Sequence, residues 1–384
     1  MKTMKPIYRH KRNQRRLLAP WRRGAADLEG LKPGGEIEER LAALKGEPAI
    51  YHCVSRVVDR RKVLGAEEKE QFVRYMREYE EFCMIRILTH CVMGNHFHIL
   101  VEIPEAPEDR GKSWSDEKFL AHISCLYHDE KFDSIAWELG DLRRHGDDEA
   151  AEAYRDKFFA RMWDLASFMH DLKMRFTKWY NWREHRDGCL WAQKFRSVLV
   201  EGGLAAQTVA AYIDLNPVRA GMVEDPKDYR WSGYGEAVAG LLRAREGLRL
   251  LVFGYEKAWR CDENAAKAGA VPWRKIAAAY RRCLYTEGGE SELDERKGRK
   301  GISRAEVAAV LAGKGRLSAA QLLQCRVRHF TEGMAIGGES FIEGVFTLAW
   351  ERFGAGRRTG ARKIRGAETE LRSLRDLGKD ALSI

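Results

Sequence analysis

Two apolar segments joined by a turn dipeptide constrain the fold of this chain more than any other feature. Residues 83–93 form a near-continuous apolar run, and residues 96–103 follow with the composition of a second strand. Gly94-Asn95 separates them, and such a pair favours the tight turn of an antiparallel hairpin. An unbroken apolar run is also typical of a strand inside a sheet. The sequence therefore predicts a β-hairpin whose first strand is central.

The segments around this hairpin predict an α+β fold. Strands are expected at residues 49–58 and 195–200, and helices at 67–81, at 154–183 (one long or two short) and at 204–215. Pro217 closes the last helix, because the residue before a proline disfavours the helical region. The resulting order, strand–helix–strand–strand–helix–strand–helix, is compatible with a ferredoxin-like antiparallel sheet.

Three further regions surround or interrupt this core. Residues 108–150 have a charged helical pattern and predict a helical insertion. Beyond residue 237 no strand is convincing, and short helices are expected at 274–285, 303–313, 318–330, 339–353 and 367–376. We therefore predict a basic arm and linker (1–46, with a short helix near 36–44), a core domain (47–236) and a helical C-terminal extension (237–384).

Positive charge is concentrated at the N-terminus. The chain has a net charge of +10, and residues 1–23 contain nine lysines and arginines and no acid. Such a block is attracted to polyanions through counterion release. A solvated, disordered tail explains the same charges equally well. The charge therefore fits a nucleic-acid partner without establishing one.

Other features of the composition exclude several classes of protein. The eight cysteines are scattered and none forms a Cys-x-x-Cys pair, which argues against a zinc ribbon or a disulfide scaffold. No apolar run approaches the roughly 20 residues of a membrane span, and the N-terminus lacks a signal-peptide pattern. We therefore expect a cytoplasmic protein, associated with the nucleoid if DNA is its partner.

Two histidines in the second hairpin strand are the first candidates for chemistry. His96 and His98 flank Phe97, and the period of two in a strand places both imidazoles on one face. Neighbouring imidazoles suit a divalent metal, particularly when oxygen ligands complete the site. Taken alone, the pair is weak evidence for a metal, because many such pairs are surface histidines on a solvated strand face.

A tyrosine and an asparagine in the segment AYIDLNPV are the second candidates. Tyr212 and Asn216 are four residues apart, so they share one face of a helix. An amide oxygen can bind a hard metal ion, and a phenol one turn away would lie beside it. Alternatively, Tyr212 is a half-buried core residue and Asn216 caps the helix C-terminus.

Taken together, these motifs resemble the REP-associated tyrosine transposases and their insertion-sequence relatives, which belong to the single-tyrosine HUH superfamily. The resemblance runs from about Ile50 to Tyr234 and rests on Tyr51-His52, MGNHFHIL, LWAQKFRSVLVE, AYIDLNPVRAGMV and DYRWSGY. Gly94 stands where relatives usually have proline. The insertion at 108–150 is longer than the family core needs, and it either covers the DNA groove or packs outside it.

The resemblance implies a role for each matching residue. His96 and His98 correspond to the metal-binding pair, Asn216 to the third ligand, and Tyr212 to the nucleophile. The implied metal is Mg²⁺ or Mn²⁺. The motif YHCVSR corresponds to the first strand of the family, which places His52 and Arg56 near the site. A core role for His52 fits equally well.

The resemblance also implies an activity. Family members cleave and rejoin single-stranded hairpin DNA through a 5′-phosphotyrosine intermediate, so hairpin DNA is the expected partner of a monomer or homodimer. One alternative is a catalytically silent DNA-binding protein or regulator that acts on repeated palindromes. Another is a metal-dependent nuclease with a water nucleophile. Tyr180, Tyr229 and Tyr234 are weaker candidates for the nucleophile, because only Tyr212 has a partnered asparagine.

Several cations are candidate DNA contacts. They are Arg56 in the first strand, Arg60, Arg61 and Lys62 in the loop after it, and Lys173, Arg175 and Lys178 in a helix. That helix also carries Phe176, Trp179, Tyr180 and Trp182, and bases could stack on these rings. Helical spacing explains the same rings as core residues. Residues 302–324 can be drawn as a helix-turn-helix with Ser303 and Ser318 as N-caps, or as a simple helical hairpin.

Overall fold

The computed structural model describes residue 19 and residues 48–254, 271–285, 333–349, 358–364 and 370–374. The predictions for most of the basic arm, for the helix near 36–44, and for the helices at 303–313 and 318–330 lie outside the described residues. The candidate helix-turn-helix lies outside them too. None of the helices in the described segments is long and apolar enough to cross a membrane.

The core is the predicted α+β fold with a ferredoxin-like strand order. Its strands run β2-β3-β1-β4, and each neighbouring pair is antiparallel. Their bounds are Ala49–Arg56 for β1, Arg86–Val92 for β2, His96–Ile103 for β3 and Arg196–Val200 for β4. Helix α3 (Ala66–Phe82) connects β1 to β2, and helix α7 (Leu165–Arg183) precedes β4. The predicted alternation of strands and helices is therefore confirmed.

The predicted hairpin forms, but its first strand is not central. The Met93 amide donates to the His96 carbonyl (2.8 Å) and closes the turn at Gly94-Asn95. Strand β2 lies at the edge of the sheet, so the prediction of a central strand is wrong. Every residue of β2 is nevertheless buried. Helices pack on both of its faces, and the Val92 amide donates to the Trp231 carbonyl (3.0 Å), which covers the edge.

The sheet continues into the C-terminal part of the chain. Strand β5 (Ala335–Gly337) pairs in parallel with β4, and β7 (Arg372–Leu374) and β6 (Arg362–Lys363) follow it. The prediction of no strand beyond residue 237 is therefore wrong, as is the helix expected at 367–376, where β7 lies. These strands contain two or three residues, too few to show a periodic pattern, and they depend on pairing with the rest of the sheet.

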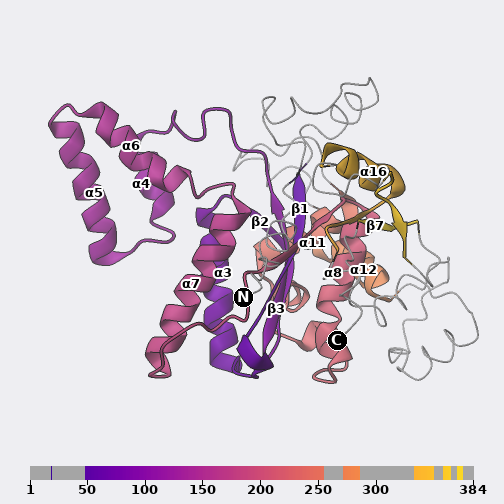
Figure 1. Ribbon diagram of the computed structural model, residues 1–384. Coiled ribbons are helices and arrows are strands. Elements are labelled where there is room, and N and C mark those ends of the chain that lie inside the picture. Colours follow the sequence, from indigo (N-terminus) through magenta and orange to yellow (C-terminus); the bar gives the residue numbers. More distant parts are fainter. Residues whose placement is uncertain are drawn as a thin grey trace, which may run out of the picture.

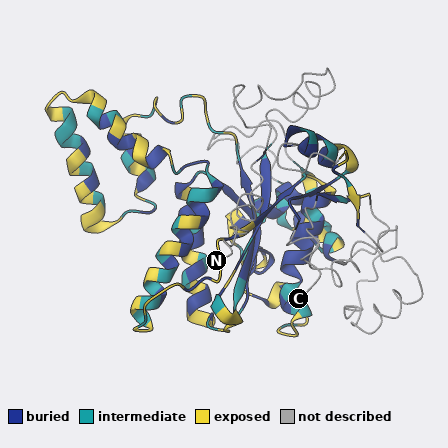
Figure 2. Cartoon of the chain, in the orientation of Figure 1, coloured by how far each residue is buried: buried dark blue, intermediate teal, exposed yellow. Residues whose placement is uncertain are grey.

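Helices cover both faces of the sheet (Figure 1). Helices α3 and α7 lie on one face. The other face carries α8 (Leu204–Asp214), α10 (Gly233–Ala239), α11 (Leu242–Phe253) and α12 (Trp273–Tyr285). Helix α16 (Glu339–Leu348) packs on β5 and β7. Short turns complete the core: η3 (Val58–Arg60), α9 (Asn216–Arg219) and η4 (Pro226–Asp228). Figure 2 shows the sheet buried between its helices.

The helical insertion lies away from the histidine end of β3. It contains α4 (Asp116–Ile123), α5 (Asp129–Arg144) and α6 (Asp148–Phe159), which follow the C-terminal end of β3. Its Tyr127 ring packs edge-on against Phe82, the last residue of α3, with the ring centroids 5.9 Å apart. The insertion therefore packs outside, at the upper left of Figure 1. The segment predicted as one long or two short helices forms two, α6 and α7.

A buried carboxyl group anchors α8 to the sheet and to α12. Asp214 is fully buried, and its carboxyl accepts hydrogen bonds from the Thr89 hydroxyl of β2 (2.9 Å) and the Tyr234 amide of α10 (3.2 Å). The Tyr280 hydroxyl of α12 also donates to it. Burial raises the pKa of Asp214 to about 7, although these hydrogen bonds oppose the shift. The end of α8 is therefore fixed by groups from three elements.

The raised pKa of Asp214 predicts how stability depends on pH. The folded protein keeps this carboxyl protonated over a range where the unfolded chain, with a pKa near 3.8, has lost the proton. Its stabilising contribution is thus complete below the unfolded pKa and is lost as pH rises through about 7. We expect the unfolding free energy of the wild type to fall relative to Asp214→Asn by on the order of a few kcal/mol across this range.

Urea denaturation of the wild type and of Asp214→Asn, at pH values from about 3.8 to above 7, measures this difference in unfolding free energy. Asp225→Asn is the control, because the pKa of Asp225 is lowered: burial, which raises it, is outweighed by the Lys227 amide and Arg281. The control should leave the pH dependence in this range nearly unchanged, because the contribution of Asp225 is lost only as pH falls below its unfolded pKa of 3.8. Parallel curves for the wild type and Asp214→Asn would contradict the burial of a neutral carboxyl.

Candidate functional site

Strand β3 presents two histidines on the face of the sheet that α8 covers. His96 and His98 lie on this face with ring centroids 5.1 Å apart, and Phe97 points to the opposite face. There the Phe97 ring packs against Phe72 of α3 with a centroid distance of 4.5 Å. The arrangement predicted from the period of two is confirmed.

A third histidine joins the pair from the neighbouring strand. His52 of β1 is completely buried, and its Nε2 lies 2.9 Å from His98 Nδ1 in a hydrogen bond. The two rings are stacked with centroids 5.1 Å apart. The bond fixes how the His98 ring is turned and leaves its Nε2 for another partner. His52 is therefore both a buried core residue and a neighbour of the candidate site, so the two interpretations of it are compatible.

Tyr212 of α8 lies over these imidazoles. Its ring makes edge contacts with His98, at a centroid distance of 5.5 Å, and with His52, at 6.0 Å. Its side chain is only 1% exposed. The sequence motifs that carry the histidines and the tyrosine are thus brought together from β1, β3 and α8. No comparable contact between an imidazole of this group and another tyrosine exists among the described residues.

Asn216 lies just beyond the end of α8. The chain leaves the helix after Asp214, and Asn216 begins the short helix α9, whose first turn contains Pro217. The Asn216 amide group donates to the backbone carbonyls of Tyr212 (2.9 Å) and Ile213 (3.3 Å), as a helix cap does. The side-chain nitrogen of Asn216 therefore caps carbonyl groups at the C-terminal end of α8, as the alternative interpretation expects. The amide oxygen is not used in either bond.

The imidazoles are held in the neutral form that a metal ion requires. Burial, reinforced by Arg56, lowers the pKa of His96 to about 4. Burial also lowers the pKa of His98 far below its usual value, and His96, His52 and Arg56 add to the effect. His96 Nδ1 lies 2.7 Å from Asn95 Oδ1, so that its Nε2 lone pair is available.

These residues fit a divalent ion with nitrogen and oxygen ligands. Neutral imidazoles, each with one nitrogen engaged by a protein group, and amide oxygens are donors of the kind that Mn²⁺ or Mg²⁺ accepts when water or substrate oxygens complete its coordination. Within the described segments, no group of three or more His, Cys, Asp or Glu side chains is arranged around a metal position. The third candidate ligand beside His96 and His98 is therefore the amide oxygen of Asn216, which is not a carboxylate, a thiol or an imidazole.

Arg219 is a site residue that the sequence analysis missed. Burial raises the pKa of Tyr212, and Arg219 opposes this shift most strongly, by its charge and by a hydrogen bond to the Tyr212 side chain. Its guanidinium carbon lies 5.3 Å from the centre of the Tyr212 ring. Helical spacing gave no sign of this contact, because Tyr212 lies in α8 and Arg219 lies in the separate short helix α9.

The predicted DNA contacts divide between two regions. Arg56, Arg60, Arg61 and Lys62 are exposed at the end of β1 and in the loop after it. By contrast, Lys173 is buried and donates to the Gln193 carbonyl (3.0 Å), and Arg175 pairs with Glu78 (2.5 Å). Lys178 is exposed. Helix α7, which carries the last three, covers the opposite face of the sheet from Tyr212.

Comparisons with known proteins match part of the chain. Residues 47–108 match a family model described as "Transposase IS200 like". A solved structure described as "Structure of the REP associates tyrosine transposase bound to a REP hairpin" is 15% identical, covers 58% of this chain and 92% of its own, and has a TM-score of 0.32. No curated protein matches the chain. The family model thus matches the segment that carries β1 to β3 and both β3 histidines, and this match supports the resemblance to the IS200-like transposases.

Proposed function

We propose that this chain is a transposase that cleaves and rejoins single-stranded DNA, with Tyr212 as the nucleophile. One observation carries the proposal: the Tyr212 ring contacts His98, whose Nδ1 is hydrogen-bonded to His52. A phenol beside neutral imidazoles suits a reaction in which phosphate charge is stabilised and a tyrosine attacks. The family match covers the strands that supply these imidazoles.

The proposed metal ligands are His96, His98 and Asn216. Bound there, Mg²⁺ or Mn²⁺ would polarise the scissile phosphate and stabilise the charge that grows on its oxygens. Asn95 orients the His96 imidazole through a hydrogen bond with its Nδ1, and His52 orients the His98 imidazole in the same way. The bonds from the Asn216 amide group to the end of α8 hold this side chain beside Tyr212.

The proposed reaction exchanges one phosphoester bond for another. The Tyr212 hydroxyl loses its proton and its oxygen attacks phosphorus in line. The bond from phosphorus to the 3′ oxygen breaks, and that oxygen takes up a proton to become a free 3′-hydroxyl. The 5′ end of the DNA stays attached as a phosphotyrosine. A second 3′-hydroxyl reverses the process and rejoins the strand without ATP, because the ester bond energy is conserved.

Arginines prepare Tyr212 for this step. At neutral pH a buried phenol keeps its proton, and burial raises the pKa of Tyr212 further. Arg219 and Arg56 oppose that shift with positive charge. The same charges attract the phosphate of the incoming strand. Single-stranded hairpin DNA is the proposed substrate, since the phosphodiester must reach a tyrosine that lies almost fully buried between α8 and the sheet.

A covalent adduct tests the proposal. Purified protein is mixed with labelled single-stranded hairpin DNA from the flanks of its own gene and with Mn²⁺ or Mg²⁺. We expect an SDS-stable protein–DNA adduct that Tyr212→Phe abolishes, because the attacking oxygen is gone. His96→Ala should slow adduct formation by at least about 10²-fold, and EDTA should prevent it. Tyr180→Phe, a matched loss of a hydroxyl on the opposite face, should leave it unchanged.

The other outcomes identify the alternatives. Metal-dependent cleavage without an adduct would mean that water is the nucleophile. Binding without cleavage, on DNA that contains the target sequence, would support a silent DNA-binding regulator of repeated palindromes. An adduct that persists in Tyr212→Phe would assign the reaction to a different tyrosine.

The role of Arg219 gives a separate prediction. Because Arg219 opposes the rise in the pKa of Tyr212, Arg219→Ala should slow adduct formation at neutral pH by about 10²-fold when DNA is saturating. The rate in this variant should keep rising to higher pH than in the wild type, since its phenol ionises later. Single-turnover adduct rates across an alkaline pH series measure both effects. Arg219→Lys should recover part of the rate, and a wild-type pH profile in Arg219→Ala would refute the assignment.

A further inference from the structure

A shallow pocket lies at the C-terminal end of α7. Lys178, Asn181 and Trp182 line it from the last turns of the helix, and His185, Arg186 and Asp187 line it from the loop that follows. The helix buries Phe176 and Tyr180 in the core, as helical spacing predicts. Trp182 differs from them because it is 78% exposed. The core interpretation of the aromatic residues of this helix therefore fails at one position.

Two cations and one acid, Asp187, line the pocket with Trp182. The residues four positions before and after it are Lys178 and Arg186, and both line the pocket with it. Another exposed tryptophan makes a useful contrast. Trp137 of α5 is 66% exposed, but the residues four positions before and after it are Asp133 and Asp141. Both tryptophans are exposed, but only Trp182 has cations at these flanking positions.

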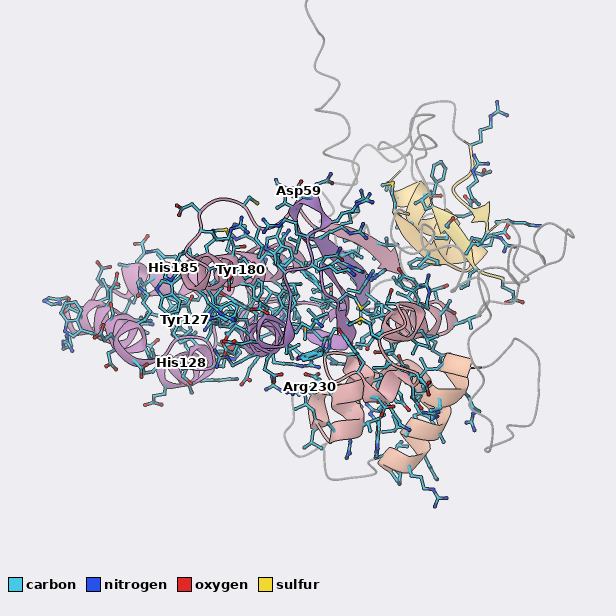
Figure 3. The ribbon with its side chains drawn as sticks, turned by 90° about the horizontal axis from the view of Figure 1, so that it is seen from below. Asp59, Tyr127, His128, Tyr180, His185 and Arg230 are labelled. Carbon is cyan, nitrogen blue, oxygen red and sulfur yellow. The ribbon has the colours of Figure 1, made fainter. Side chains whose placement is uncertain are left out.

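The pocket lies at the same end of the sheet as Tyr212 and the histidines. The loop after α7 leads from it to β1: the Val58 amide donates to the Leu190 carbonyl (2.9 Å), and the Ala192 amide donates to the Arg56 carbonyl (2.9 Å). Arg56 in turn stands opposite His96 in the register of β1 with β3. Figure 3 views the molecule from this end, with His185 marking the pocket and Asp59 the turn after β1.

Exposed cations also lie at this end of the sheet. Lys194 and Arg196 lie at the start of β4, and Arg60, Arg61 and Lys62 follow β1. The loop that contains the latter three is held beside the histidines, because the Asn95 side chain donates to the Arg60 carbonyl (2.8 Å). These cations could bind the phosphates of a nucleic-acid strand that extends from Tyr212 along this end of the sheet.

We propose that the pocket is a base-stacking subsite for single-stranded DNA. One base of the strand lies against the Trp182 indole, and Lys178 and Arg186 bind the phosphates on either side of it. The inference rests on the proposed function, since it takes the strand to be the substrate held by Tyr212. Stacking requires an unpaired base whose face is open, so the subsite selects single strands over duplex.

Binding without cleavage isolates this subsite from catalysis. The full chain is titrated in EDTA with a fluorescent 30-nucleotide oligothymidylate and with an abasic deoxyribose-phosphate chain of the same length, and anisotropy is recorded. Trp182→Ala should weaken binding of oligothymidylate by about tenfold and leave the abasic chain unaffected, because only a base can stack. Trp182→Phe should retain most of the affinity. Trp137→Ala is the matched control and should bind like the wild type.

Photo-crosslinking then locates the contact. Oligothymidylate that carries 5-iodouracil is irradiated with the protein, and the modified peptides are mapped by mass spectrometry. The subsite predicts a crosslink at Trp182. Equal affinity of Trp182→Ala and wild type for oligothymidylate, or equal losses for both polymers, would overturn the proposal. A tenfold stacking effect without any Tyr212 adduct would instead retain the subsite and refute the proposed reaction.

Discussion

The antiparallel pairing of β1 with β3 sets Arg56 opposite His96 and Val54 opposite His98. Because side chains alternate along a strand, this register gives the sheet one apolar face under α3 and α7 and one face with a polar end under α8. A slip of one residue in β3 would bury both histidines against α3 and expose Phe97 to α8. The hydrophobic pattern that stabilises the sheet therefore also aims the imidazoles at Tyr212.

The position of Tyr212 depends on a second constraint, the buried carboxyl of Asp214. It joins the end of α8 to Thr89 of β2 and to Tyr280 of α12, so a helix far along the chain helps to hold the segment that carries Tyr212. Helix α11 packs on β2, and β5 extends the sheet beside β4. The described parts of the C-terminal half thus share a core with the strands that carry the histidines.

Sequence reasoning succeeded where a short local pattern decides the structure. The turn at Gly94-Asn95 and the alternation around Phe97 needed no tertiary information. It failed where tertiary context decides. The strands β5 and β7 are too short to show a pattern, and the edge position of β2 is hidden because helices bury both of its faces. Arg219 was missed because its partner Tyr212 lies in another helix, α8, while Arg219 lies in α9. Lys173 was misjudged because its positive charge gave no sign of burial.

The central claim is that Tyr212 forms a covalent bond with DNA. Peptide mass spectrometry of the protein after reaction with hairpin DNA and exhaustive nuclease digestion tests it most directly. We expect a tryptic peptide with a nucleotide joined through phosphate to Tyr212, present with Mn²⁺ or Mg²⁺ and absent with EDTA. A nucleotide on any other residue, or cleaved DNA with an unmodified Tyr212 peptide throughout the reaction, would contradict it.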